Sequence, residues 1–193
     1  MSRNARASAS SRAPSSRHKD GAASKPQVLA AGKYLRLVRD DGWEYCERTQ
    51  ATGVVAIVVV ADGRLILTEQ YRKAVGCRVL DLPAGLAGDI PGGESEELAV
   101  AAQRELLEEV GYSARRMVRL AGCPTSPGLT SEIVTFFRAV GVKQAGTGGG
   151  DASESIHIRA VPLRTATAWL KRQAAAGLLI DAKVFAGLYF AKG

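Results

Sequence analysis

The sequence has few of the residues that build covalent cross-links and transition-metal sites. Its 193 residues include only three cysteines and two histidines. Cys46, Cys77 and Cys123 are odd in number and widely spaced, so they predict neither a disulfide framework nor a CxxC metal site. No cysteine has a histidine near it in the sequence, so nothing indicates a cysteine nucleophile. We interpret the three as reduced thiols of a cytoplasmic protein.

Long apolar segments are also absent. No stretch approaches the roughly 18 consecutive apolar residues of a membrane-spanning helix, so we expect no membrane span. Residues 1–30 lack the apolar core of a secretory signal, and they contain no leucine, isoleucine or valine before Val28. Their Ser-, Ala- and Arg-rich composition cannot bury enough surface to fold alone. We predict a disordered basic tail, with weak nucleic-acid contact or a transit peptide as the alternatives.

The net charge of +7 is concentrated at the start of the chain. Residues 1–32 hold six basic residues and one acidic residue, whereas the remainder holds 20 basic and 18 acidic residues. The first stretch therefore contributes +5 and the rest of the chain only +2. Because the isoelectric point near 9.6 is mostly a property of the tail, we do not expect nucleic acid to be a partner of the folded domain.

An acidic strip marks the middle of the sequence. Glu105, Glu108 and Glu109 are spaced i, i+3 and i+4, which places them on one strip of a helix surface. Like charges at this spacing destabilise an isolated helix by about 0.2–0.5 kcal/mol per pair. The strip is therefore either a solvated face or a site for a hard cation. Oxygen-only ligands favour Mg²⁺ or Mn²⁺ over zinc.

The strip lies in a strand–loop–helix unit. Residues 81–86 (DLPAGL) form a short run broken by Pro and Gly, residues 87–94 form a Gly-rich acidic loop, and a helix is predicted over 95–110. An apolar stripe runs along that helix: Ala99, Ala102, Leu106 and Val110. Gly111 suits the left-handed position that follows a helix end. The bare backbone at Ala84-Gly85 can approach a ligand or offer a carbonyl to a metal.

This unit resembles the Nudix box, G-x5-E-x7-R-E-U-x-E-E-x-G-U, in which U is a bulky aliphatic or aromatic residue. The stretch 96–112 matches every position from the first glutamate onward. Ten residues instead of five separate Gly85 from Glu96, so the loop 86–95 looks like a five-residue insertion. Glu94 is an alternative first glutamate and a possible extra ligand, but it breaks the spacing to the arginine of the box.

Further segments resemble one subgroup, the ADP-ribose pyrophosphatases: 43–48 (WEYCER), 69–72 (EQYR), 82–85 (LPAG) and 126–132 (SPGLTSE). Pro127, fifteen residues after Tyr112, is the usual mark of this subgroup, although nucleoside-diphosphate-sugar hydrolases share parts of it. The resemblance implies hydrolysis of ADP-ribose, or a related ADP-sugar, to AMP and ribose 5-phosphate. The alternatives are a hydrolase of GDP-sugars or diadenosine polyphosphates, and a catalytically inactive ADP-ribose sensor.

The resemblance also assigns roles near the box. It implies Mg²⁺, or Mn²⁺, held by these groups: the Ala84 carbonyl, Glu96, Glu105, Glu108 and Glu109. Arg104 is expected to orient the carboxylates rather than to touch substrate, and Glu108 lies among the catalytic residues. The general base in this subgroup is a glutamate on a loop before a late strand, the place of Glu154. Asp151 and Glu132 are further candidates, and a plain loop charge is the alternative for Glu154.

Substrate-binding roles follow from the same resemblance. Trp43 is similar to an aromatic residue that stacks on adenine, often from the partner subunit of a swapped homodimer. The alternative is that it belongs to the core of the hairpin. Arg72 resembles a phosphate-binding arginine, with a surface ion pair as the alternative. The remaining candidates are Arg48, Gly85, Pro127, Gly128 and Glu132.

The order of predicted elements indicates an α/β fold, an α/β/α sandwich with a mixed sheet. Residues 1–30 are assigned to the tail, 31–50 to an N-terminal hairpin region for dimerisation and 51–193 to the catalytic Nudix domain. Asp41-Gly42 predicts a hairpin turn. The run 53–60 (GVVAIVVV) predicts a strand buried on both faces. Two helices are expected near 164–175 and 182–191, with Asp181 as the N-cap of the second.

Overall fold

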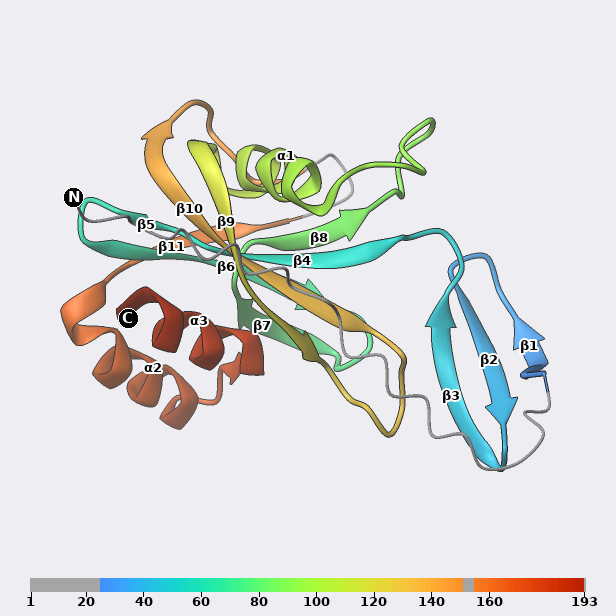
Figure 1. Cartoon of the computed structure of the whole chain (residues 1–193). Coiled ribbons are helices and arrows are strands. Elements are labelled where there is room, and N and C mark those ends of the chain that lie inside the picture. The colour runs from blue at the N-terminus through green and yellow to red at the C-terminus, as the bar shows by residue number, and fades with distance from the viewer. Residues whose placement is uncertain (1–24, 151–154, 193) are drawn as a thin grey trace, which may run out of the picture.

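The computed structural model describes residues 25–150 and 155–192 of the chain. The predictions for residues 1–24 and for the loop residues Asp151 and Glu154 lie outside the described residues. Three sheets and three α-helices make up the described part (Figure 1). Among the described residues, no helix has the length and apolarity to cross a membrane.

The first sheet is antiparallel and consists of β1 (Gln27–Ala31), β2 (Leu35–Asp40) and β3 (Trp43–Arg48). Asp41 and Gly42 both have positive φ, 46° and 82°, as a tight two-residue turn requires. This sheet extends to one side of the molecule in Figure 1. β1 starts inside the stretch 1–30 that was assigned to the tail. Its backbone pairs with β2, the next strand along the chain, and composition does not reveal this pairing.

Two further sheets form the body of the molecule. One has the order β8-β4-β10-β9, from β4 (Gly53–Val58), β8 (Ala84–Ala87), β9 (Tyr112–Pro124) and β10 (Ile133–Gln144). The other has the order β11-β6-β7-β12, from β6 (Arg64–Arg72), β7 (Cys77–Asp81), β11 (His157–Pro162) and β12 (Leu179–Ile180), with β5 (Val60–Ala61) on β6. The pairs β4–β10 and β7–β12 are parallel and the others antiparallel, so both sheets are mixed.

Helices cover the two faces of this body, as Figure 1 shows. Along β4, Val55 and Ile57 pack in one core with α1 (Leu98–Val110). Ala56 and Val58 face the opposite core, with α2 (Ala166–Ala175) and α3 (Ala182–Lys192). All four side chains are buried, which explains the continuous apolar run of this strand. The predicted α/β class with a mixed sheet is confirmed.

The helix ends follow local chemistry. Gly111 adopts φ 72° and donates its N–H to the carbonyls of Leu106 and Leu107, the expected left-handed end of α1. The Asp181 carboxylate accepts the N–H of Lys183 at 2.9 Å, so Asp181 caps α3 as predicted. α1 begins at Leu98, three residues after the predicted start at 95, because the preceding turn remains part of the loop. A 3-10 turn, Leu163–Thr165, precedes α2.

The N-terminal sheet is joined to the body through the loop between β9 and β10. The N–H of Cys46 on β3 donates to the carbonyl of Leu129 at 2.9 Å, and the N–H of Ser131 donates to the carbonyl of Cys46 at 3.1 Å. An ion pair of 2.6 Å between Arg48 and Glu132 adds to this contact. The sheet and the body therefore meet along a segment that contains several of the predicted substrate-binding residues.

Candidate active site

A cleft of about 680 Å³ opens where β6, β7, β8 and α1 meet the start of α3. Nine charged side chains line it: Arg48, Arg72, Asp81, Asp89, Glu105, Glu109, Glu132, Asp181 and Lys183. Six of these are carboxylates and three are basic, so the lining is negative overall. The cleft therefore favours a cation and disfavours an anion that arrives without one.

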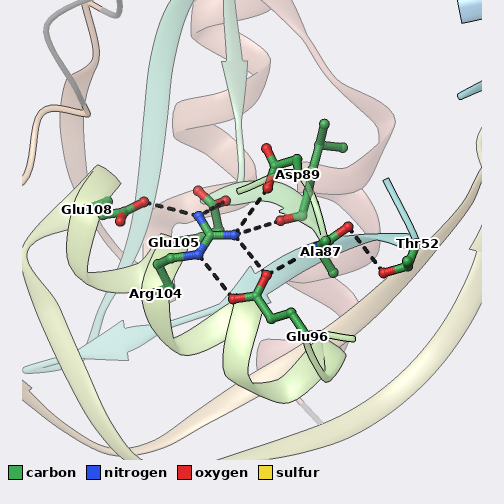
Figure 2. A network of polar contacts seen from close by, with 9 residues as sticks. Thr52, Ala87, Asp89, Glu96, Arg104, Glu105 and Glu108 are labelled. Carbon is green, nitrogen blue, oxygen red and sulfur yellow. Dashed lines mark hydrogen bonds and ion pairs between the residues drawn. The ribbon is translucent and has the colours of Figure 1, made fainter. Parts of the chain in front are cut away.

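Arg104 is the centre of the polar network on α1, as Figure 2 shows. Its Nε donates to Glu96 Oε1 at 3.2 Å, and its Nη1 donates to Glu105 at 2.8 Å and to Glu108 at 3.2 Å. Its Nη2 donates to the carbonyl of Leu86 at 2.8 Å. One planar guanidinium thus holds three carboxylates of the helix region and the backbone of β8 in a fixed relation, which is the arrangement that a positioning role for Arg104 requires.

Glu96 lies within hydrogen-bonding distance of Arg104 in spite of the long loop before it. Its Oε2 accepts the N–H of Gly88 and an Nη2 hydrogen bond from Arg104, both at 3.2 Å. The hydrogen bonds from Arg104 hold the pKa of Glu96 below its usual value. Asp89, in the same loop, lies 3.5 Å from Arg104, whereas Glu94 is exposed. The loop therefore presents Glu96, and not Glu94, to the arginine.

The Glu105 carboxylate lies directly over the backbone of Gly85. A Cβ atom at position 85 would stand 2.0 Å from Cδ and 2.1 Å from Oε1 of Glu105, so a larger residue there would force the carboxylate out of this position. Burial raises the pKa of Glu105 to about 7, although Arg104 acts in the opposite direction. Glu105 is therefore a desolvated carboxylate whose charge the protein compensates only in part.

Glu109 completes the acidic edge of the cleft. Its side chain is buried, and its Oε2 accepts the N–H of Ala84 at 2.9 Å. The donor set beside Gly85 is thus made of carboxylates and backbone, and together with the negative lining it fits a hard divalent cation. Within residues 25–150 and 155–192, no three Asp, Glu, His or Cys side chains already converge on one point as a metal site. Three of the box carboxylates are turned toward Arg104 instead.

The predicted substrate-binding residues fall into two places. Arg48, Arg72, Gly85 and Glu132 line the cleft with the box. Arg72 lies 3.7 Å from Asp81, and Arg48 is paired with Glu132.

Three others lie elsewhere. Trp43, Pro127 and Gly128 line a separate hollow of about 320 Å³ next to the turn of the N-terminal sheet. Trp43 is 67% exposed there and does not line the cleft of its own chain. For Trp43 to stack on adenine, it would therefore have to reach the cleft of a second chain, or its own cleft in another conformation.

Sequence reasoning missed a second charged group in the cleft. Lys183 Nζ lies 3.1 Å from Asp81 and 2.8 Å from Asp181, and so joins the end of β7 to the start of α3. Burial raises the pKa of Asp81 to about 6 and outweighs the opposite effect of Lys183. The only signal in the sequence was the N-cap at Asp181, which places Lys183 in the first turn of a helix but says nothing about the cleft.

Residues 49–182 match the family model described as NUDIX domain. A methanol dehydrogenase activator of Bacillus methanolicus is 31% identical over 157 residues, which is 77% of this chain and 82% of that protein.

Two relatives carry the name ADP-ribose pyrophosphatase. The one from Bacillus subtilis (strain 168) is 39% identical over 88 residues, 45% of each chain. The one from Mycobacterium tuberculosis is 40% identical over 127 residues, 62% of this chain and 59% of that protein. The chain thus aligns with about half the length of these two. A solved structure titled as an ADP compounds hydrolase shares the fold, with a TM-score of 0.59 and 24% identity over 79% of this chain and 86% of that one.

Proposed function

The chain belongs to the Nudix family of hydrolases, and we propose that it cleaves the pyrophosphate of ADP-ribose, or a related ADP-sugar, to give AMP and ribose 5-phosphate or the corresponding sugar phosphate. A substrate of nucleotide-sugar type follows from the family. The observation that carries the proposal is the cleft itself, which is lined both by Arg72 and Arg48 and by the box carboxylates Glu105 and Glu109. Relatives named ADP-ribose pyrophosphatase support the choice of substrate.

Nudix hydrolases use divalent metal ions, and for this chain we propose Mg²⁺, with Mn²⁺ as the alternative. Glu105, Glu109 and the Ala84 carbonyl would hold it, with support from Glu96 and Glu108. When bound, the metal would neutralise phosphate charge and lower the pKa of a coordinated water.

The protein's own groups would supply the remaining functions. Arg72 and Arg48 would bind phosphate oxygens, for which a planar guanidinium is well suited. Arg104 would keep the carboxylates in place without touching the substrate. We retain Glu154 as the proposed general base because of its place in the sequence before β11; it lies outside the described residues.

We also propose that the protein is a homodimer that acts in the cytoplasm. Trp43 on the N-terminal sheet is exposed and lies outside the cleft of its own chain. A second copy would receive Trp43 at its cleft, where the indole would stack on adenine. The three free thiols suit a reducing compartment.

A substrate panel tests the proposal. Purified protein with Mg²⁺ should release AMP from ADP-ribose faster than it cleaves GDP-mannose or diadenosine polyphosphates. Glu109→Gln, prepared in parallel, should lose this activity and so exclude a contaminating hydrolase. A clear preference for GDP-mannose or a dinucleoside polyphosphate would replace ADP-ribose as the substrate. Tight ADP-ribose binding with no turnover would identify a sensor.

A further inference from the structure

The segment after β10 is docked on the end of α1 through backbone contacts. We call residues 145–150 (AGTGGG) the strap. The N–H groups of Ala145 and Gly146 donate to the carbonyl of Gly111 at 2.8 and 2.9 Å. Because Gly111 ends α1, the strap begins where the helix that carries the box stops.

The strap also binds the last turn of that helix. The N–H of Gly149 donates to the carbonyl of Glu109 at 2.8 Å, and the N–H of Gly150 donates to the carbonyl of Glu108 at 3.0 Å. The final carbonyls of a helix have no partner within the helix. Here the two that belong to box glutamates are bound by the strap.

Glycine permits this close approach on both sides. A Cβ atom at Gly148 would lie 2.6 Å from the carbonyl carbon of Val110 and 2.7 Å from the nitrogen of Gly111. A Cβ atom at Gly111 would in turn lie 2.4 Å from the carbonyl oxygen of Gly146. These contacts are with backbone atoms, which cannot move aside as the end of a flexible side chain does.

We propose that Gly148 is a positioning residue for the divalent metal site, an inference that rests on the proposed function. Glu109 is held at two points: its carbonyl accepts from the strap, and its carboxylate accepts from Ala84 on β8. The strap fixes the main chain of the last turn of α1, and the Glu109 carboxylate keeps its place at the cleft edge as a result. Metal ligands require such support, since small displacements weaken binding.

The substitution Gly148→Ala tests the inference. Gly148 has φ +66°, so alanine there introduces both left-handed strain and the clash with α1. Gly63→Ala is the matched control, because Gly63 has φ +69° with no heavy atom within 4 Å of the added Cβ. The Mn²⁺ affinity is measured by electron paramagnetic resonance without substrate. It should fall about tenfold or more in Gly148→Ala and stay near wild type in Gly63→Ala. Near-wild-type Mn²⁺ affinity in a folded Gly148→Ala protein would overturn the inference.

A measurement on the wild type covers the case in which Gly148→Ala does not fold. Coupling between two sites is reciprocal, so Mg²⁺ binding should slow hydrogen exchange at the amides of Gly149 and Gly150. Unchanged exchange at both amides would show that the strap is not coupled to the metal site. ADP-ribose hydrolysis is assayed separately. If Mn²⁺ binding depends on Gly148 but ADP-ribose is not cleaved, the strap inference holds and the proposed substrate fails. Absence of Mn²⁺ binding by the wild type overturns both.

Discussion

The contact between Gly85 and Glu105 gives the sharpest prediction about the site. A methyl group at position 85 would stand 2.0 Å from Cδ of Glu105, whereas ordinary van der Waals contact begins at 3.4 Å. The carboxylate would have to retreat by more than an ångström. Gly85 is not among the residues with positive φ, so alanine fits its backbone conformation. The effect of Gly85→Ala should therefore come from the side-chain clash alone.

We expect Gly85→Ala to lower the free energy of unfolding by about 1–3 kcal/mol, because the displaced Glu105 carboxylate would lose its hydrogen bond from Arg104. The same substitution in the Glu105→Ala background should change stability little, because the clashing group is gone. The interaction energy of the double-mutant cycle should then equal nearly the whole cost, about 1–3 kcal/mol. Urea unfolding of the four proteins at pH 7 without divalent metal measures it. Mn²⁺ binding to Gly85→Ala should fall about tenfold or more, because a ligand has moved.

Gly128→Ala serves as the stability control, since a Cβ atom there has no heavy atom within 4 Å and φ is not positive. It should unfold like the wild type. If Gly85→Ala destabilises the protein equally with and without the Glu105 side chain, the clash is not the cause. The Glu105 carboxylate would then lie elsewhere, and its placement as a ligand beside the backbone of β8 would be refuted.

Three further predictions concern single residues. Arg104→Lys keeps the charge but loses the planar fork, so Mn²⁺ affinity should fall about 10–100-fold with an unchanged circular dichroism spectrum; unchanged affinity would exclude the positioning role. Burial raises the pKa of Glu69, but hydrogen bonds from Arg159 and Arg78 outweigh burial and lower it overall. A lowered folded pKa gives stability at neutral pH that is lost as the pH falls. Glu69→Gln should therefore cost about 1–3 kcal/mol at pH 7 in urea unfolding, and the gap to the wild type should close as the pH drops below 4.5. Glu154→Gln should lower kcat about 100-fold or more at unchanged Mn²⁺ affinity; turnover within a few-fold of wild type would rule out Glu154 as the base.

The parts of the fold that follow from the sequence are those set by near neighbours along the chain. The apolar stripe of α1, its left-handed end at Gly111 and the turn at Asp41-Gly42 each depend on a few adjacent residues. The burial of β4 on both faces is likewise visible in an unbroken β-branched run. These features could be predicted because periodicity and backbone preference are local properties.

The parts that the sequence did not reveal depend on distant partners. β8 contains only four residues, and it is a strand because Gly85 pairs with Val55 on β4. Lys183 reaches the cleft because α3 starts beside the end of β7, about one hundred residues earlier in the chain. The sequence pattern makes Trp43 similar to an adenine-stacking residue, but it does not show which cleft the side chain faces. Tertiary pairing decides all three.

The long loop before Glu96 shows which feature of the box is physically constrained. The chain leaves the body after β8 and returns at α1, as Figure 1 shows. On the way, the N–H of Gly93 donates to the carbonyl of Ile90, and the N–H of Glu96 donates to the carbonyl of Gly93. Doubling a loop from five to ten residues costs only about 0.6 kcal/mol in closure entropy. A hydrogen bond between charged groups contributes about 1.5–3 kcal/mol, and Arg104 makes two to Glu96. The contact therefore offsets the extra length, and the spacing of the motif can vary as long as its first glutamate reaches the arginine.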